Sequence, residues 1–225
     1  MQEEAVFIPA REVSLEGRYC FQTMHKGVLV CHPHPEYGGE MSNNVVQAVV
    51  EAFSSLGWTT LRFNFRGVGQ SSGRYSKGVG EQEDVRAAYA FLKEKGLNLI
   101  IVAGYSFGGW VAARVVKELE AGGLLLVSPP VALMDFSFKD LGISCWIVYG
   151  ERDPFCPEDQ LKNLTGATSC IRESRSIPGA DHFYWGYEQQ IQDAIKRWFG
   201  ETPTTYERAA SGNGHCTATE VKRNG

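Results

Sequence analysis

Gly104-Tyr105-Ser106-Phe107-Gly108 follows the pattern Gly-x-Ser-x-Gly. A strand-like apolar run, Leu99 to Ala103, precedes it, and a segment with helical spacing, Trp110 to Leu119, follows it. A serine at such a turn has a strained backbone, and neighbouring side chains would collide there, so glycine is needed on both sides. The hydroxyl then stands clear of the sheet, beside helix amides that favour negative charge on a substrate oxygen. The segment therefore predicts that Ser106 is a nucleophile.

Around this turn, strand-like runs alternate with segments of helical period as far as residue 200. That alternation is typical of a mostly parallel sheet with helices on both faces. In the run Thr59 to Phe65, apolar residues alternate with Arg62 and Asn64, so one face or end of this strand should meet polar surroundings. About 25 residues at the N-terminus show no clear pattern. The remaining runs are almost continuously apolar, as in strands buried on both faces: Gly27 to Cys31, Leu97 to Ala103, Leu124 to Val127 and Cys145 to Tyr149.

Four segments carry apolar residues at helical spacing, and each stops close to a glycine. They run from Val46 to Leu56, Val85 to Leu92, Val111 to Leu119 and Ile191 to Trp198. After Gly200 the composition changes, because no Leu, Ile, Phe or Trp occurs from Glu201 to Gly225. We therefore predict one domain over residues 1–200 and a flexible C-terminal tail over residues 201–225.

A serine hydroxyl is a weak nucleophile, so it needs a base, and the base needs a carboxylate that fixes its tautomer. Glu151 and Asp153 follow the apolar run that ends at residue 149, where open α/β sheets place their sites. Asp153 is the predicted acid, with Glu151 as the alternative. His182, in the loop before the last helix, is the predicted base, and Asp181 beside it is expected to cap that loop or the helix. The chain order Ser106, Asp153, His182 matches the order expected with this serine turn.

The other histidines are weaker candidates for the base. His215 lies in the predicted tail, and His25 precedes a strand and belongs at the opposite end of the sheet. His32 and His34 lie at the correct end, and a His-x-His pair could chelate a metal. No Glu or further His at a fixed spacing completes such a set, so we predict no metal site.

Acyl transfer produces an oxyanion, which needs two preorganised hydrogen-bond donors. One is the amide of Phe107, directly after the serine. The second should come from the loop that follows the strand ending at Cys31. Prolines 33 and 35 have no amide hydrogen, which leaves His34 as the preferred donor and Tyr37 as the alternative.

The glycines from Gly67 to Gly73 also follow a strand and could be taken for a dinucleotide loop. Their spacing, Gly-x-Gly-x-x-x-Gly, is one residue too long, and no helix opens directly after them. The sequence has no Gly-x₄-Gly-Lys-Ser/Thr phosphate loop. We therefore predict that the protein uses no cofactor.

The composition excludes several classes of protein. Lys and Arg number 22 against 26 Asp and Glu, and no basic run exceeds Lys222-Arg223, which argues against nucleic-acid binding. The longest apolar run is too short for a membrane span. The N-terminus is acidic and lacks a signal-like apolar core, so we expect a cytoplasmic protein. The six cysteines form no Cys-x-x-Cys pair and are expected to be reduced.

Four segments together resemble a known family: His32-Pro33-His34-Pro35 with Gly38-Gly39, the run from Leu61 to Gly69, Gly104 to Gly109, and Gly179-Ala180-Asp181-His182-Phe183. They resemble the α/β-hydrolase superfamily over about residues 20 to 200. Within it, the chain looks like a small, cap-less, esterase-like subfamily related to dienelactone hydrolases.

This resemblance implies an α/β-hydrolase fold, with a mostly parallel sheet of about seven or eight strands and no large cap domain. It also implies cofactor-free hydrolysis by a triad of Ser106, Asp153 and His182. Three residues, Asn64, Arg66 and Gly67, would shape a loop beside the site. Dienelactone hydrolases themselves have a cysteine nucleophile where this chain has Ser106, so their substrate is not carried over.

Residues 131–144 leave room for a short helix between two strands but not for a lid, so the site should be open. Aromatic residues gather near the predicted chemistry, and a pocket lined by them would suit an apolar acyl or aryl group. The predicted substrate-binding residues are Tyr37, Tyr105, Phe155, Phe183 and Trp185.

The sequence therefore predicts a serine hydrolase that cleaves small-molecule carboxylic esters through an acyl-enzyme on Ser106. Two alternatives remain open. The same triad could cleave amides or peptides, or the chain could be a non-catalytic interaction module on the same fold. The sequence indicates no oligomeric state.

Overall fold

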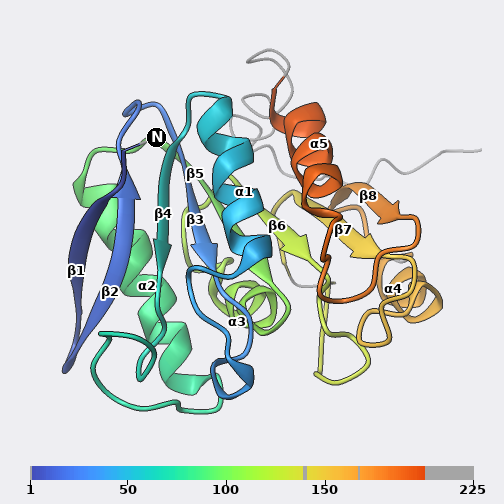
Figure 1. The fold of residues 1–225 in the computed structure, drawn as a ribbon, viewed down its shortest axis with the longest axis horizontal. Coiled ribbons are helices and arrows are strands. Elements are labelled where there is room, and N and C mark those ends of the chain that lie inside the picture. Colours follow the sequence, from blue (N-terminus) through green and yellow to red (C-terminus); the bar gives the residue numbers. More distant parts are fainter. Residues whose placement is uncertain (1, 139–140, 167, 201–225) are drawn as a thin grey trace, which may run out of the picture.

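The computed structural model describes residues 2–138, 141–166 and 168–200, and an eight-stranded sheet forms its centre (Figure 1). The strand order across the sheet is β1-β2-β4-β3-β5-β6-β7-β8. From β4 to β8 all neighbours run parallel, which confirms the predicted mostly parallel sheet. The strands are β1 (Glu4–Ala10), β2 (Val13–Cys20), β3 (Lys26–Cys31), β4 (Thr59–Phe63), β5 (Leu99–Tyr105), β6 (Gly123–Val127), β7 (Cys145–Gly150) and β8 (Ile171–Ile177).

The N-terminal region, which showed no pattern in the sequence, forms the antiparallel pair β1 and β2. Strand β2 also pairs antiparallel with β4, so the hairpin extends one edge of the sheet. Buried Ile8 and Leu15 face each other across the pair, while the charged residues between them stay accessible. Only one face of this hairpin is covered, so charged residues such as Glu16 and Arg18 can occupy the other face.

Two layers of helices cover the sheet (Figure 1). Helices α1 and α5 pack against each other on one face, and α2 packs beside α3 on the other. Within the described ranges, no helix is both long and apolar enough to cross a bilayer. The helices are α1 (Asn44–Ser55), α2 (Val79–Glu94), α3 (Phe107–Val115), α4 (Glu158–Thr165) and α5 (Glu188–Phe199), with a short 3-10 helix, η1 (Pro35–Tyr37).

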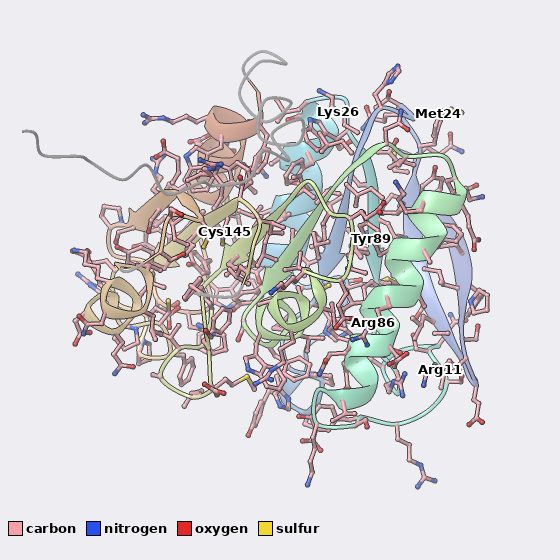
Figure 2. All side chains as sticks on the ribbon, turned by 180° about the vertical axis from the view of Figure 1, so that it is seen from behind. Arg11, Met24, Lys26, Arg86, Tyr89 and Cys145 are labelled. Carbon is pink, nitrogen blue, oxygen red and sulfur yellow. The ribbon has the colours of Figure 1, made fainter. Side chains whose placement is uncertain are left out.

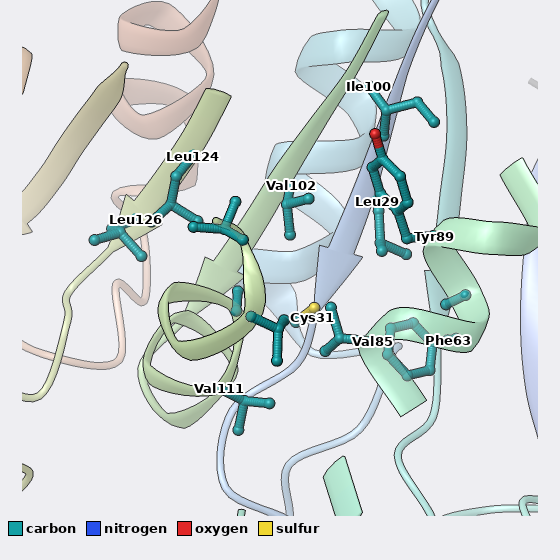
Figure 3. Packing of buried hydrophobic residues seen from close by; sticks show 14 of the residues in the cluster. Leu29, Cys31, Phe63, Val85, Tyr89, Ile100, Val102, Val111, Leu124 and Leu126 are labelled. Atoms are coloured by element: carbon teal, nitrogen blue, oxygen red, sulfur yellow. The ribbon is translucent and has the colours of Figure 1, made fainter. Parts of the chain in front are cut away.

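The core beneath α2 and α3 is continuous across the central strands (Figure 3). Val85 of α2 and Val111 of α3 belong to the same cluster as Cys31 and Val102 of the central strands, and all four are fully buried. Figure 2 shows Arg86 on α2 and Arg11 on the neighbouring hairpin, and Glu83 of α2 pairs with both of them at 3.0 and 3.1 Å. Because these ion pairs are at least partly exposed, they contribute about 1 kcal/mol or less each, and buried apolar area carries most of the stability.

The sequence made predictions about the chain segments on both sides of β6. The α-helix after the serine turn ends at Val115, whereas the sequence predicted helix to Leu119. Residues 116–120 form turns instead, with the amides of Glu118 and Leu119 bonding three residues back, because the chain reverses there to enter β6. The described residues between 131 and 144 contain turns and no helix or strand, so no lid is inserted. The predicted tail, residues 201–225, lies outside the described residues, and the domain boundary at residue 200 stays a prediction.

Candidate active site

Ser106 lies at the sharp turn between β5 and α3, with φ 52° and ψ −121°. A positive φ is costly for a residue other than glycine, so the surrounding structure has to hold the turn in place. A Cβ at Gly104 would lie 2.5 Å from the backbone of Gly108, and one at Gly108 would collide with the carbonyl of His32. The two glycines are therefore required by close backbone approach, as the sequence predicts.

The hydroxyl of Ser106 lies 3.0 Å from Nε2 of His182, and Nδ1 of His182 lies 2.8 Å from Oδ2 of Asp153. An ionised carboxylate can only accept, so Nδ1 carries the hydrogen and Nε2 is free to accept from the serine hydroxyl. All three side chains are buried or nearly so. The carboxyl ends of β5, β7 and β8 thus bring three residues that are far apart in the sequence into one hydrogen-bonded chain.

Asp153 and its rival Glu151 occupy different environments. Asp153 is 4% exposed, and its Oδ1 accepts from the amides of Phe155 and Cys156 at 2.8 and 3.1 Å. Glu151 is exposed, and its carboxylate accepts from the amide of Gly179 at 2.7 Å. The structure therefore brings Asp153, and not Glu151, to His182. Asp181 caps the loop, as the sequence predicts, because its Oδ1 accepts from the amide of Phe183 at 2.9 Å.

The two candidate oxyanion donors after β3 are distinguished by their hydrogen bonds. The amide of Tyr37 donates to the carbonyl of His34 at 3.1 Å and is already used. Within the described part of the chain, the amides of His34 and Phe107 donate to no other protein group. Both residues line the same cavity as Ser106. This arrangement favours His34 over Tyr37 as the second donor.

The His34 ring is held in place on three sides. Its Nδ1 accepts from the amide of Glu36 at 3.2 Å, so Nε2 carries the hydrogen and donates to the Tyr75 hydroxyl at 3.0 Å. The ring also packs against Phe107, with centroids 4.8 Å apart. Burial lowers the pKa of His34, which keeps the ring neutral. These contacts fix the loop that presents the His34 amide.

The loop after β4 is anchored away from the cavity. Arg66 forms a bidentate ion pair with Asp84 of α2, in which Nη2 donates to Oδ1 at 2.7 Å and Nε donates to Oδ2 at 3.1 Å, and the Asp84 side chain is fully buried. Asn64 accepts from the amide of Met41 at 2.8 Å and so joins this loop to the one after β3. These contacts tie the loop after β4 to α2 and to the loop after β3, and the role beside the site that the family resemblance implied for Asn64, Arg66 and Gly67 stays a prediction.

A cavity of about 520 Å³ opens at Ser106. Four of the five predicted substrate-binding residues line it: Tyr37, Tyr105, Phe155 and Phe183. Trp185 does not line this cavity and its side chain is 73% exposed, so its predicted part in substrate binding stays a prediction. The preceding residue, Tyr184, has φ 58° and is buried with its hydroxyl 2.7 Å from that of Ser128, so the chain turns the next side chain outward.

One wall of the cavity was not predicted from the sequence. Pro130, Leu133 and Met134, in the loop after β6, complete the apolar lining. A loop has no periodicity that reveals its inward side, but Leu133 stands out as a large apolar residue that is 67% exposed. Tyr37 and Phe183 are also exposed at this cavity, and a patch of exposed apolar side chains is a signal for a binding surface.

The His-x-His pair is not arranged as a metal site. His32 is fully buried, its Nε2 accepts from the amide of Phe65 at 3.0 Å, and its Nδ1 donates to the carbonyl of Pro33 at 2.6 Å. Both ring nitrogens are therefore occupied. No group of three or more His, Cys, Asp or Glu side chains that could hold a metal occurs among the residues with described placement. His32 instead ties the loop after β3 to the loop after β4.

This buried histidine predicts a loss of stability in acid. Burial lowers the pKa of His32 to about 4, whereas the unfolded chain takes up the proton near 6.5. The unfolded state therefore binds more protons as pH falls, so stability is complete above pH 6.5 and declines towards pH 4. We expect the decline to cost about 3 kcal/mol of unfolding free energy from this group alone. Denaturant unfolding at several pH values measures it.

The matched variant is His32→Gln, which keeps an uncharged acceptor but has no proton to take up. We expect it to be less stable than the unaltered protein near pH 7.5 and to show a shallower decline between pH 6.5 and pH 4. His25→Gln, at an exposed position, controls for the substitution itself. Equal slopes for the unaltered protein and His32→Gln would assign the acid sensitivity to other groups.

A known protein family and several known proteins are similar to this chain. A family model described as "Alpha/beta hydrolase domain" matches residues 27–196. An uncharacterized protein of Rickettsia prowazekii is 34% identical over 215 residues, covering 89% of this chain and 90% of that protein. A structure described as an alpha-beta serine hydrolase homologue from Coxiella burnetii is 33% identical, with a TM-score of 0.79, and covers 88% of this chain and 98% of the other. A structure from Xanthomonas campestris, described as an a/b serine hydrolase without lid, is 27% identical with a TM-score of 0.82, over 90% and 98% of the two chains.

Proposed function

Because this chain belongs to the alpha/beta hydrolase domain family, we propose that it is a hydrolase that cleaves carboxylic esters through an acyl-enzyme on Ser106. The observation that carries the proposal is the hydrogen-bonded chain from the Ser106 hydroxyl through His182 to Asp153. A serine hydrolase homologue and a lid-free serine hydrolase among its structural neighbours support the reaction class. We place the reaction in the cytoplasm, as predicted from the sequence.

In the proposed mechanism, the Ser106 oxygen attacks the ester carbonyl carbon while Nε2 of His182 takes the hydroxyl proton. The carbonyl π electrons move to oxygen, and the amides of Phe107 and His34 donate to that oxyanion. As the carbonyl reforms, the bond to the alcohol oxygen breaks, and His182 returns the proton to the leaving group. A water activated by His182 then repeats the sequence and releases the acid. Asp153 keeps the imidazole in the required tautomer throughout.

The test of this function compares one acyl group on two leaving groups. We expect purified protein to hydrolyse a short p-nitrophenyl ester measurably and the matching p-nitroanilide much more slowly, since an amine leaves less readily than a phenolate. Faster cleavage of the anilide would favour the amidase or peptidase alternative. No turnover of either, together with no labelling by a fluorophosphonate probe, would favour the non-catalytic module.

We propose further that the acyl group is uncharged, and the lining of the cavity supports this. Among the described residues that line the cavity there is no Lys, Arg, Asp or Glu. Leu133, Met134 and Phe155 supply an apolar surface on which a hydrocarbon chain or an aryl ring gains from being removed from water. An ionised acyl group would have to give up hydration there without a partner.

We therefore expect a p-nitrophenyl ester of a neutral acid to have a kcat/KM at least about tenfold above that of the ester of a dicarboxylic half-acid with the same chain length. A tenfold ratio corresponds to about 1.4 kcal/mol, a small part of the cost of desolvating a charge, because the cavity stays open to solvent. Steady-state kinetics at pH 7.5 measure both values. Equal values would mean that the charged end stays in water and that this surface does not hold the acyl group.

A further inference from the structure

The loop that carries His182 is held by its main-chain carbonyls rather than by regular secondary structure. Between β8 and α5 the chain forms turns, and Tyr184 within it has a positive φ. Three carbonyls of the loop accept hydrogen bonds from three different parts of the fold. The donors are the Arg152 amide to the carbonyl of Ala180 at 2.8 Å, the Tyr105 hydroxyl to that of His182 at 2.6 Å, and the Asn44 side-chain amide to that of Phe183 at 3.0 Å.

We infer that Tyr105 is a positioning residue for His182, a role that rests on the proposed function of the site. Tyr105 is the last residue of β5 and is covalently joined to Ser106. Its hydroxyl can only donate to the His182 carbonyl, because a carbonyl has no hydrogen to give. The nucleophile and the main chain of the base are therefore connected through one side chain on a central strand.

The packing around the Tyr105 side chain limits the movement of its hydrogen bond to the His182 carbonyl. Tyr105 is 3% exposed, and its ring lies against the His182 imidazole with centroids 5.3 Å apart and planes 36° apart. Phe155 packs against the imidazole from another side, with the centroids of the two rings 4.8 Å apart. The hydrogen bond fixes how far the His182 backbone stands from the strand end, and the two rings fix the plane of the imidazole. Together they set the 3.0 Å separation of Nε2 from the Ser106 hydroxyl.

The position of the hydroxyl also shows what Tyr105 does not do. It lines the cavity of Ser106, and the sequence predicted it as a substrate-binding residue. Its polar atom, however, is engaged by the protein, and almost none of its surface is accessible. Tyr105 can therefore present at most a ring edge to a substrate, and removal of its hydroxyl should change the geometry of the base without changing the surface that binds an ester.

A matched pair of substitutions tests this inference. Tyr105→Phe removes a buried hydroxyl that donates to the loop, and it leaves the His182 carbonyl without this donor. Tyr184→Phe removes a buried hydroxyl within the same loop, and it leaves the Ser128 hydroxyl without this partner. A small displacement of a catalytic group can cost on the order of 100-fold in rate. We expect Tyr105→Phe to lower kcat for a neutral p-nitrophenyl ester by roughly 10- to 100-fold, with KM changed less than about twofold. Tyr184→Phe should keep kcat within about twofold.

Labelling of Ser106 by a fluorophosphonate provides a second readout, since it needs the serine and its base but not an ester pocket. The labelling rate of Tyr105→Phe should fall by the same factor as kcat, and both variants should unfold at similar, moderately lowered temperatures. Unchanged kcat, a change confined to KM, an equal loss in Tyr184→Phe, or a Tyr105→Phe protein that does not fold would each overturn the inference. A failure of the proposed function is recognised separately, because the unaltered protein would then neither turn over esters nor become labelled.

Discussion

Turnover of a short p-nitrophenyl ester should fall by roughly 10⁶-fold when Ser106 is replaced with Ala, a loss on the scale of removing the nucleophile from a serine hydrolase. Among the described residues, the Ser106 hydroxyl is the oxygen hydrogen-bonded to His182 Nε2, and the proposed acyl-enzyme forms on it. The oxyanion donors are main-chain amides and remain in the variant, so only weak residual hydrolysis by water is expected. Steady-state kinetics, with fluorophosphonate labelling as a parallel measurement, give the result.

Ser128→Ala is the matched control for this substitution. Ser128 also follows the end of a central strand, is buried and has a positive φ of 45°, so the two variants change the same atom in similar backbone surroundings. The Ser128 hydroxyl lies 2.7 Å from that of Tyr184 and outside the chain from Ser106 to Asp153. We expect Ser128→Ala to lose some stability and to keep its turnover. Activity that survives in Ser106→Ala would reject the assignment of the nucleophile.

The central sheet could be predicted because the buried environment of its strands allows few types of residue. Strands such as β5 and β6 are buried on both faces, so nearly every residue in them has to be apolar, and the runs are visible without an alignment. The β1–β2 hairpin could not be read in the same way. Its strands lie at an edge with one face accessible, and charged residues such as Glu16 and Arg18 interrupt the pattern.

Some residues of the site could be predicted more easily than others, because only some of their positions are constrained by the local backbone. Ser106 sits in a turn that demands glycines at fixed positions, so its place in the chain is marked locally. The direction in which a loop side chain points is not marked in this way. Trp185 and Leu133 are both exposed apolar residues in loops, yet of these two only Leu133 lines the cavity, and nothing in their local sequence distinguishes them.

Replacing Asp153 with Asn should lower kcat by roughly 10⁴-fold while leaving the fold in place. The reason lies in how both carboxylate oxygens are used. Oδ1 accepts from the amides of Phe155 and Cys156, and Oδ2 accepts from Nδ1 of His182. In the variant, the single amide oxygen has to face the two main-chain donors, so the NH₂ group faces His182 and needs an acceptor there. Nδ1 then gives up its hydrogen, and Nε2, now protonated, can no longer accept the proton of Ser106.

Glu151→Gln separates this tautomer effect from a general loss of negative charge beside the loop. The side-chain oxygen of the introduced glutamine can still accept from the Gly179 amide, which Glu151 binds at 2.7 Å, and the carboxylate bonded to the imidazole is that of Asp153. We expect kcat to stay within about threefold of the unaltered protein, because an exposed charge interacts only weakly through water. A large loss in Glu151→Gln with little change in Asp153→Asn would transfer the role of the acid to Glu151. That result would require the loop after β7 to rearrange when substrate binds, since the Glu151 carboxylate is bonded to the Gly179 amide and not to His182.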